Sequence, residues 1–323
     1  MTTANPPAVT TRTVVSGSTS GHRFVSAFGL TGSGDPPTSQ VIMKAAIFEE
    51  LKDSTFAVDL TAQGAPLHAN PDDVQRVLNH LDFNHVTLVA DGHSATGRGV
   101  PLLPHGGFKA EADLYEPLTQ ILNAIIDATN FCLTGPRYLA ALRFHRHDAQ
   151  MQDTLDSERS LKPDIVGHPL HKPDGKLSWK DVTVFLEVKN RPRDAFKQLA
   201  TYARCHLALD RRRSFSIAMS FNHKELELCF YCFHRSGVSF SPQLRLDRED
   251  GFKCVIKHMV GIMSIPDEAA FGLDATRVKD VYRINSRNYD IVRTIQRRAS
   301  IRGHSTIVYS LKRKELLFWF VHT

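Results

Sequence analysis

Apolar residues recur along the chain at two spacings, one typical of helices and one typical of strands, and these spacings predict its main regular elements. Helical spacing marks residues 109–129 and 194–209 as the two strongest amphipathic helices. The apolar stripes are Leu114, Leu118, Ile121, Leu122 and Ile125 in the first segment, and Ala195, Leu199, Tyr202, Ala203 and His206 in the second. Shorter helices are predicted over residues 41–51, 71–81 and 252–263, with Asn70 as the N-cap and Pro71 as the first residue of the middle one.

Runs rich in β-branched and aromatic residues predict the strands. They cover residues 86–90, 138–144, 182–189, 214–221, 226–233 and 238–240, and a Gly-, Pro- and His-rich loop is expected over residues 91–107. A turn at Pro173-Asp174-Gly175 makes the segment around residues 162–165 and the 182–189 strand an antiparallel hairpin. From residue 109 onward the order is helix, strand, hairpin, helix, strand, strand, which predicts an α/β sandwich around a mixed central sheet flanked by helices.

Length and composition indicate a globular protein that has several parts. Its 323 residues exceed one typical domain, and 42% hydrophobic with 23% charged residues are typical of a globular protein with a substantial core. We expect a disordered tail over residues 1–40, a helical N-terminal extension over 41–108, the α/β domain over 109–275 and a basic C-terminal segment over 276–323.

The cysteines and the lengths of the apolar runs indicate in which cellular compartment the protein is expected. Five scattered cysteines without a secretory signal favour a reducing, intracellular location, nuclear or cytoplasmic, rather than secretion. Cys229 and Cys232 form a C-x-x-C pair, but three positions apart on a strand they face opposite ways, which argues against a shared zinc ion. No run approaches the roughly 18 apolar residues of a membrane span, so no membrane partner is expected.

Candidate chemistry lies on the central hairpin. Alternation in the 182–189 strand places Glu187 and Lys189 on one face with Thr183 and Phe185, and Asp164 is brought close by the hairpin. Two carboxylates that bind Mg²⁺ or Mn²⁺, beside a lysine that positions water or stabilises phosphate charge, suit phosphodiester hydrolysis. The alternative is a Lys-Pro-Asp turn and a Glu-x-Lys strand that have arisen by chance.

Two further groups of charged residues are open to two interpretations each. Glu111 lies on the stripe of the first long helix and points into a site, unless Pro117 delays the start of that helix and leaves Glu111 in solvent. Arg211, Arg212 and Arg213 follow the second long helix, either as a solvated helix end or as a patch that faces phosphate.

The order Asp164, Glu187-Val188-Lys189 and Gln198-Leu199-Ala200-Thr201-Tyr202 resembles the PD-(D/E)xK nuclease superfamily, in the branch with a Q-x-x-x-Y helix. The resemblance implies a restriction-endonuclease-like α-β-β-β-α-β core. It also implies that Asp164 and Glu187 bind Mg²⁺ or Mn²⁺ and that Lys189 assists the attacking water. Gln198 and Tyr202 would support the site or the nucleic-acid backbone, and Glu111 would be an additional acid.

A second resemblance, from about residue 111 to residue 309, is to the N-terminal region of fungal-type protein kinases. It is carried by Glu111-Ala112-Asp113-Leu114-Tyr115-Glu116-Pro117-Leu118, Lys162-Pro163-Asp164-Ile165-Val166-Gly167, Trp179, residues 198–204, 212–215, 234–238 and 271–274. Residues 302–309 resemble the start of a kinase lobe, but no H-R-D or D-F-G motif follows, so kinase activity is not expected of this chain.

Three functions remain open at this point. The first is a metal-dependent endonuclease or exonuclease acting on DNA or RNA. The second is an inactive nuclease-like module that binds a kinase or another protein and regulates it. The third is nucleic-acid binding without cleavage through the basic stretch over residues 287–302, which a net charge of +6 permits and for which a solvated helix face is the alternative.

Overall fold

A computed structural model gives the fold of the chain. It describes residues 47–83, 89–90, 93–94, 111–147, 149–152, 161–169, 177–210, 212–274, 276–278, 281–284, 287–297 and 307–313. The tail expected over residues 1–40, the start of the 41–51 helix and the turn at residues 173–175 lie outside these ranges. No helix within them is both long and apolar enough to cross a membrane.

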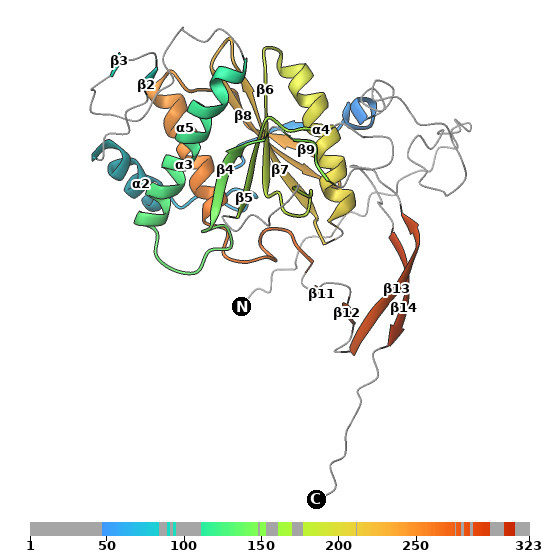
Figure 1. Ribbon diagram of the computed structural model, residues 1–323. Helices are drawn as coiled ribbons and strands as arrows, with labels where there is room; N and C mark the ends of the chain where they lie inside the picture. The colour runs from blue at the N-terminus through green and yellow to red at the C-terminus, as the bar shows by residue number, and fades with distance from the viewer. Residues whose placement is uncertain are drawn as a thin grey trace, which may run out of the picture.

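An eight-stranded mixed sheet forms the centre of the molecule (Figure 1). Its order is β1-β9-β8-β7-β6-β5-β4, with the short β10 also paired to β8. The strands are β1 (Thr55–Ala57), β4 (Leu142–Arg146), β5 (Ile165–Pro169), β6 (Val184–Lys189), β7 (Phe215–Asn222), β8 (Glu227–His234), β9 (Gly237–Phe240) and β10 (Leu244–Arg245). Neighbours are antiparallel except for the parallel pairs β6–β7 and β1–β9.

Helices cover both faces of this sheet and enclose two apolar cores. On one face lie α2 (Pro71–Phe83), the short 3₁₀ helix η1 (Glu111–Leu114), α3 (Tyr115–Cys132) and α5 (Glu249–Met263). The other face carries α4 (Pro192–Leu209) and the helical residues 47–51. The predicted fold class, a mixed α/β sandwich with a central sheet flanked by helices, is therefore confirmed.

The alternation predicted for β6 separates these two cores. Val184, Leu186 and Val188 pack into the core under α3 and α5, whereas Phe185 packs into the core under α4. Val182 precedes the strand and packs on the α4 side, whereas alternation predicts that it shares the face of Val184. Cys229 and Cys232 likewise fall in different cores, as expected of positions three apart on β8.

The first long helix begins in two steps. Glu111–Leu114 is a 3₁₀ turn, and the α-helix proper begins at Tyr115. Pro117 is then the third residue of the α-helix, where a missing backbone N–H costs nothing. The predicted stripe from Leu114 to Ile125 is buried, and Glu111 lies on the turn before the helix.

The predicted strand over residues 138–144 is shifted in the structure. Residues 138–141 form a turn that is closed by a 2.9 Å hydrogen bond from the Leu142 N–H to the Leu139 carbonyl. The Asn130 side chain binds the carbonyl of Ala140 from α3 at 2.9 Å. β4 therefore starts at Leu142 and continues to Arg146, beyond the apolar run that suggested it.

Residues 47–83, which fall within the predicted helical N-terminal extension, contribute to the sheet and to both cores. β1 pairs with β9 through the register Phe56 to Ser239, and Ile47 and Leu51 are fully buried under α4. The predicted cap of α2 is present, because the Asn70 side chain accepts the Asp72 N–H at 2.9 Å. Within the predicted 91–107 loop, β3 (His93–Ser94) pairs with β2 (Val89–Ala90).

The described part of the basic C-terminal segment, between residues 277 and 313, forms another sheet and not a helix. β11 (Arg277–Val278), β12 (Val281–Ile284), β13 (Arg287–Arg297) and β14 (Ile307–Arg313) are antiparallel in that order and lie beside the main body in Figure 1. The helical alternative for residues 287–302 is wrong over 287–297. In β13 Tyr289 lies opposite Arg313, so β-sheet pairing decides the conformation there.

Candidate active site

Strand pairing brings the predicted catalytic residues together. β5 and β6 are antiparallel with Ile165 opposite Leu186, so Asp164, directly before β5, meets Glu187 near the end of β6. The Asp164 carboxylate is held there by a 2.8 Å hydrogen bond from the Val188 backbone N–H to Oδ2. Lys189 is the last residue of β6.

The start of α3 completes the cluster from the other side. The Tyr115 hydroxyl donates to Asp164 Oδ1 at 2.8 Å and lies 3.1 Å from Glu111 Oε1. Burial and these two carboxylates raise the pKa of Tyr115 above its ordinary value, which keeps the phenol protonated as a donor. Glu111 therefore points towards Lys189 and Tyr115, but from a 3₁₀ turn before the helix and not from the helical stripe, because the α-helix begins only at Tyr115.

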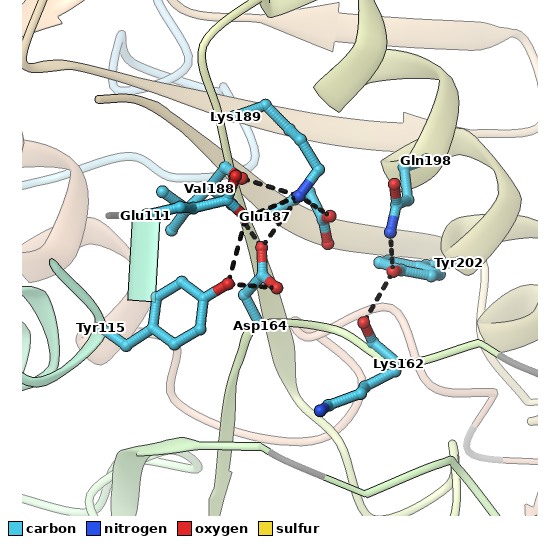
Figure 2. A network of polar contacts seen from close by, with 9 residues as sticks. All are labelled: Glu111, Tyr115, Lys162, Asp164, Glu187, Val188, Lys189, Gln198 and Tyr202. Carbon is cyan, nitrogen blue, oxygen red and sulfur yellow. Dashed lines mark hydrogen bonds and ion pairs between the residues drawn. The ribbon is translucent and has the colours of Figure 1, made fainter. Parts of the chain in front are cut away.

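Lys189 lies at the centre of three acids (Figure 2). Its Nζ is 2.8 Å from Glu187 Oε1, 2.9 Å from Glu111 Oε1 and 3.4 Å from Asp164 Oδ2, and it also donates to the Val188 carbonyl at 2.8 Å. Burial lowers the pKa of Lys189, but the surrounding carboxylates outweigh burial and raise the pKa above its usual value. The lysine therefore stays charged and neutralises part of an acidic cluster.

Glu187 is the most deeply buried of the three acids. Its side chain is 0% exposed, Oε1 pairs with the Lys189 ammonium at 2.8 Å, and Oε2 has no hydrogen-bond partner among the described residues. Burial, together with repulsion from Asp164, raises the pKa of Glu187 to about 8 against the opposing effect of Lys189. A buried carboxylate with an unsatisfied oxygen is a group that gains from a further cation.

The Q-x-x-x-Y helix supports the segment that carries Asp164. On α4 the Gln198 amide donates to the Tyr202 hydroxyl at 2.5 Å, and this hydroxyl donates to the Lys162 carbonyl at 3.0 Å (Figure 2). Tyr202 is 0% exposed and packs edge-on against Phe185. Its burial favours support of the Lys162–Asp164 segment over the contact with nucleic acid that was the other expectation.

The arginines after α4 are not brought into this cluster. Arg213 is buried, pairs with Asp210 at 3.3 Å and lies over the Phe271 ring, and Arg212 is paired with Glu268 at 3.2 Å. Both follow the C-terminal end of α4, whereas Gln198 lies in its N-terminal half. The structure therefore gives Arg213 no open surface for phosphate, and Arg211 lies outside the described residues.

The cluster contains oxygen ligands of the kind that a divalent cation prefers. Carboxylate oxygens are the ligands that Mg²⁺ and Mn²⁺ prefer, and the cluster offers Asp164, Glu187 and Glu111. Among the described residues, however, no group of three or more His, Cys, Asp or Glu side chains is spaced to hold a metal ion. The buried Glu187 carboxylate beside Asp164, whose Oε2 lacks a hydrogen-bond partner among the described residues, is the feature that fits a cation.

Sequence reasoning did not assign a role to Tyr115 or to the Val188 backbone. Tyr115 is four residues after Glu111, which places the two side chains on one side of the helix start, and this spacing was the available signal. The Val188 N–H bond depends on the hairpin register, which the sequence alone does not give.

Comparison with known proteins gives one result for part of the chain. Residues 163–320 match the family model described as fungal protein kinase. The matched segment includes Asp164, Glu187, Lys189, Gln198 and Tyr202 but excludes Glu111 and Tyr115. The predicted resemblance to fungal-type protein kinases is confirmed for this segment. No curated protein and no solved structure matches the chain.

Proposed function

We propose that this protein is a metal-dependent nuclease of the PD-(D/E)xK type, which hydrolyses phosphodiester bonds with Mg²⁺ or Mn²⁺. The observation that carries the proposal is the convergence of Asp164, Glu187 and Lys189 where β5 begins and β6 ends. The element order α3, β4, β5, β6, α4, β7 supports it, because this is the α-β-β-β-α-β order of a restriction-endonuclease-like core.

Each residue of the cluster has a distinct role in this proposal. Asp164 and Glu187 would hold the cation, with Glu111 as a further oxygen ligand. When bound, the cation supplies stabilisation of the negative charge that develops on the phosphate. Lys189 positions the attacking water and adds a fixed positive charge beside the phosphate. Tyr115 and the Val188 N–H fix the direction of the Asp164 carboxylate, and Gln198 and Tyr202 hold the chain before it.

The charge balance of the site favours a cation. Three carboxylates surround one lysine within 3.4 Å, so negative charge remains even when Glu187 carries a proton. Burial, together with repulsion from Asp164, raises the pKa of Glu187 to about 8. A divalent cation would relieve the same repulsion more completely and satisfy the buried oxygens.

The alternative function is an inactive nuclease-like module that binds or regulates another protein. Two observations favour it: the match of residues 163–320 to a family described as fungal protein kinase, and the ion pairs that Lys189 already makes to all three acids. In this case the cluster is a structural ion-pair network. Its loss would then lower stability without any metal-dependent activity to lose.

Cleavage assays test the proposal. Supercoiled plasmid, single-stranded DNA and single-stranded RNA are incubated with wild type, Lys189→Ala and Asp164→Asn in Mn²⁺, in Mg²⁺ and in EDTA. Lys180→Ala is the matched control, because Lys180 is an exposed lysine before β6. We expect cation-dependent cleavage by wild type and Lys180→Ala, reduced at least 100-fold in the two site variants. Cleavage of equal rate in all four proteins, or none in any, contradicts the proposal.

A further inference from the structure

A cavity of about 330 Å³ opens on the α4 side of the sheet. Helical residues 47–51, the first turns of α4, and strands β8 and β9 surround it. Four aromatic rings line it, those of Phe48, Phe196, Tyr231 and Phe240, and the cations Lys52 and Arg193 are also among its lining residues. No residue of the proposed catalytic cluster takes part, so this cavity is a separate feature.

Three of these four rings are partly exposed, so a ligand in the cavity can contact them. Phe48, Phe196 and Phe240 are only half-buried, whereas Tyr231 is buried at the base. Phe196 meets Tyr231 at 5.9 Å between ring centroids, and Phe240 stacks on Tyr231 at 6.2 Å with 29° between the planes. A planar group entering the cavity would therefore meet a cluster of neighbouring aromatic rings.

Positive charge accompanies these rings. The Arg193 guanidinium lies 5.0 Å from the centre of the Phe48 ring, and the Lys197 ammonium lies 5.7 Å from it. Lys52 is exposed and pairs with exposed Glu49 at 3.6 Å, a contact that solvent screens. Planar apolar surface next to cations suits a ligand that is both aromatic and anionic.

The cavity and the catalytic cluster flank the same helix. Phe196 and Gln198 are two residues apart on α4, about 200° around the helix axis, so they face opposite sides. Gln198 donates to the Tyr202 hydroxyl, which binds the Lys162 carbonyl in the segment before Asp164. Phe196 lines the cavity. Only Asn190 and Arg191 separate Lys189 from Pro192, which lines the cavity, so the two sites adjoin along the chain.

We propose that this cavity holds one unstacked base of a single-stranded nucleic acid, with Arg193 and Lys52 contacting phosphates on either side of that base. The same strand then passes over the N-terminal end of α4 towards Asp164, Glu187 and Lys189. The placement of the strand rests on the proposed nuclease function, whereas the base site rests on the cavity alone. Rings with exposed faces and adjoining cations favour a nucleotide over the apolar side chain of a protein partner, which needs no phosphate contact.

Binding of fluorescein-labelled single-stranded DNA, measured by anisotropy in EDTA, tests the base site without cleavage. Gln243→Trp fills the cavity from its exposed rim, and Phe240→Ala removes one ring. Arg193→Ala removes a rim charge, with Arg248→Ala as the matched control because Arg248 is exposed at the start of α5. Circular dichroism and thermal unfolding establish that each variant is folded.

We expect Gln243→Trp and Phe240→Ala each to weaken binding roughly tenfold, the scale of one base–aromatic stack. Arg193→Ala weakens binding and makes its salt dependence shallower, whereas Arg248→Ala does neither. An oligonucleotide of abasic sites binds wild type about tenfold more weakly than one with bases. Equal affinity of wild type and folded Gln243→Trp, or of abasic and normal strands, overturns the base site and leaves a protein side chain as the occupant.

The two proposals fail in different ways. If no cation-dependent cleavage is found but binding depends on Gln243 and Phe240 as described, the base site stands and the nuclease function falls. If wild type cleaves DNA and Gln243→Trp cleaves single strands with unchanged KM and kcat, the nuclease function stands and the base site falls.

Discussion

At the scale of single residues, the burial of Glu187 makes the molecule sensitive to pH. The pKa of this carboxyl is about 8 in the folded protein and about 4.5 in an ordinary environment. Between these values the folded state binds more protons than the unfolded state, so stability falls as pH rises. The contribution is fully present below pH 4.5 and is lost through pH 8.

Glu187→Gln removes this titration while keeping the shape of the side chain. We expect the variant to gain stability relative to wild type between pH 5.5 and pH 8.5, by about 1.4 kcal/mol for each pKa unit removed and up to a few kcal/mol in total. Urea unfolding at both pH values measures the difference. Glu116→Gln, at an exposed position, is the control, and an equal pH dependence of the two variants would refute the assignment.

Tyr115 is a second residue with a separable role. Tyr115→Phe keeps the ring and deletes the hydroxyl that donates to Asp164 at 2.8 Å. A hydrogen bond to a charged group contributes about 1.5–3 kcal/mol, so we expect a fall in unfolding free energy of this size and slower cation-dependent cleavage. Chemical denaturation and initial cleavage rates check both effects. Unchanged values in both measurements would remove Tyr115 from the site.

At the scale of elements, α4 holds the Asp164 segment through the Tyr202 side chain. The Tyr202 hydroxyl reaches the Lys162 carbonyl, and Gln198 orients that hydroxyl. The helical stripe predicted Tyr202 as a buried residue, and the Q-x-x-x-Y resemblance predicted support of the site. The partner of Tyr202, a backbone carbonyl 40 residues away, follows only from the packing of α4 over the β5–β6 hairpin.

Tyr202→Phe therefore loosens the segment before β5 and leaves α4 intact. We expect amide hydrogen exchange over residues 161–169 to accelerate several-fold, because the Lys162 carbonyl loses its donor. Residues 215–222 of β7, in the middle of the sheet, serve as an internal control in the same experiment. Equal acceleration in both segments would indicate general destabilisation and contradict the specific support.

Local pattern predicted most elements of the sheet and its helices but not their long-range partners. The spacing of apolar residues, together with the turn residues, directly predicts β7, β8, β9, α4 and α5. The pairing of Thr55 with Val238 joins positions far apart in sequence, and β1 is exposed along its length, so no local period reveals it. For β13, a run of arginines suggested a solvated helix, and pairing with β14 determines a strand instead.

At the scale of the whole molecule, the N-terminal segment is part of the α/β body. Leu51 is fully buried under α4 and also lines the cavity beside it, whereas nearby Val58 is 39% exposed. Leu51→Ala should lower the unfolding free energy by about 2–4 kcal/mol, and Val58→Ala by about 0.5 kcal/mol or less. Thermal and urea unfolding compare the two. A small effect of Leu51→Ala would show that residues 47–58 are dispensable for the core.

Calorimetric titration with Mn²⁺ tests the central claim most directly, because the cluster must hold a cation if it hydrolyses phosphodiesters. Wild type is compared with Asp164→Asn and with Asp127→Asn, which changes an exposed acid on α3 that pairs with Arg143. The account predicts one Mn²⁺ site in wild type and in Asp127→Asn, and at least tenfold weaker binding in Asp164→Asn. Equal Mn²⁺ affinity in all three proteins, or no binding to wild type, would contradict it.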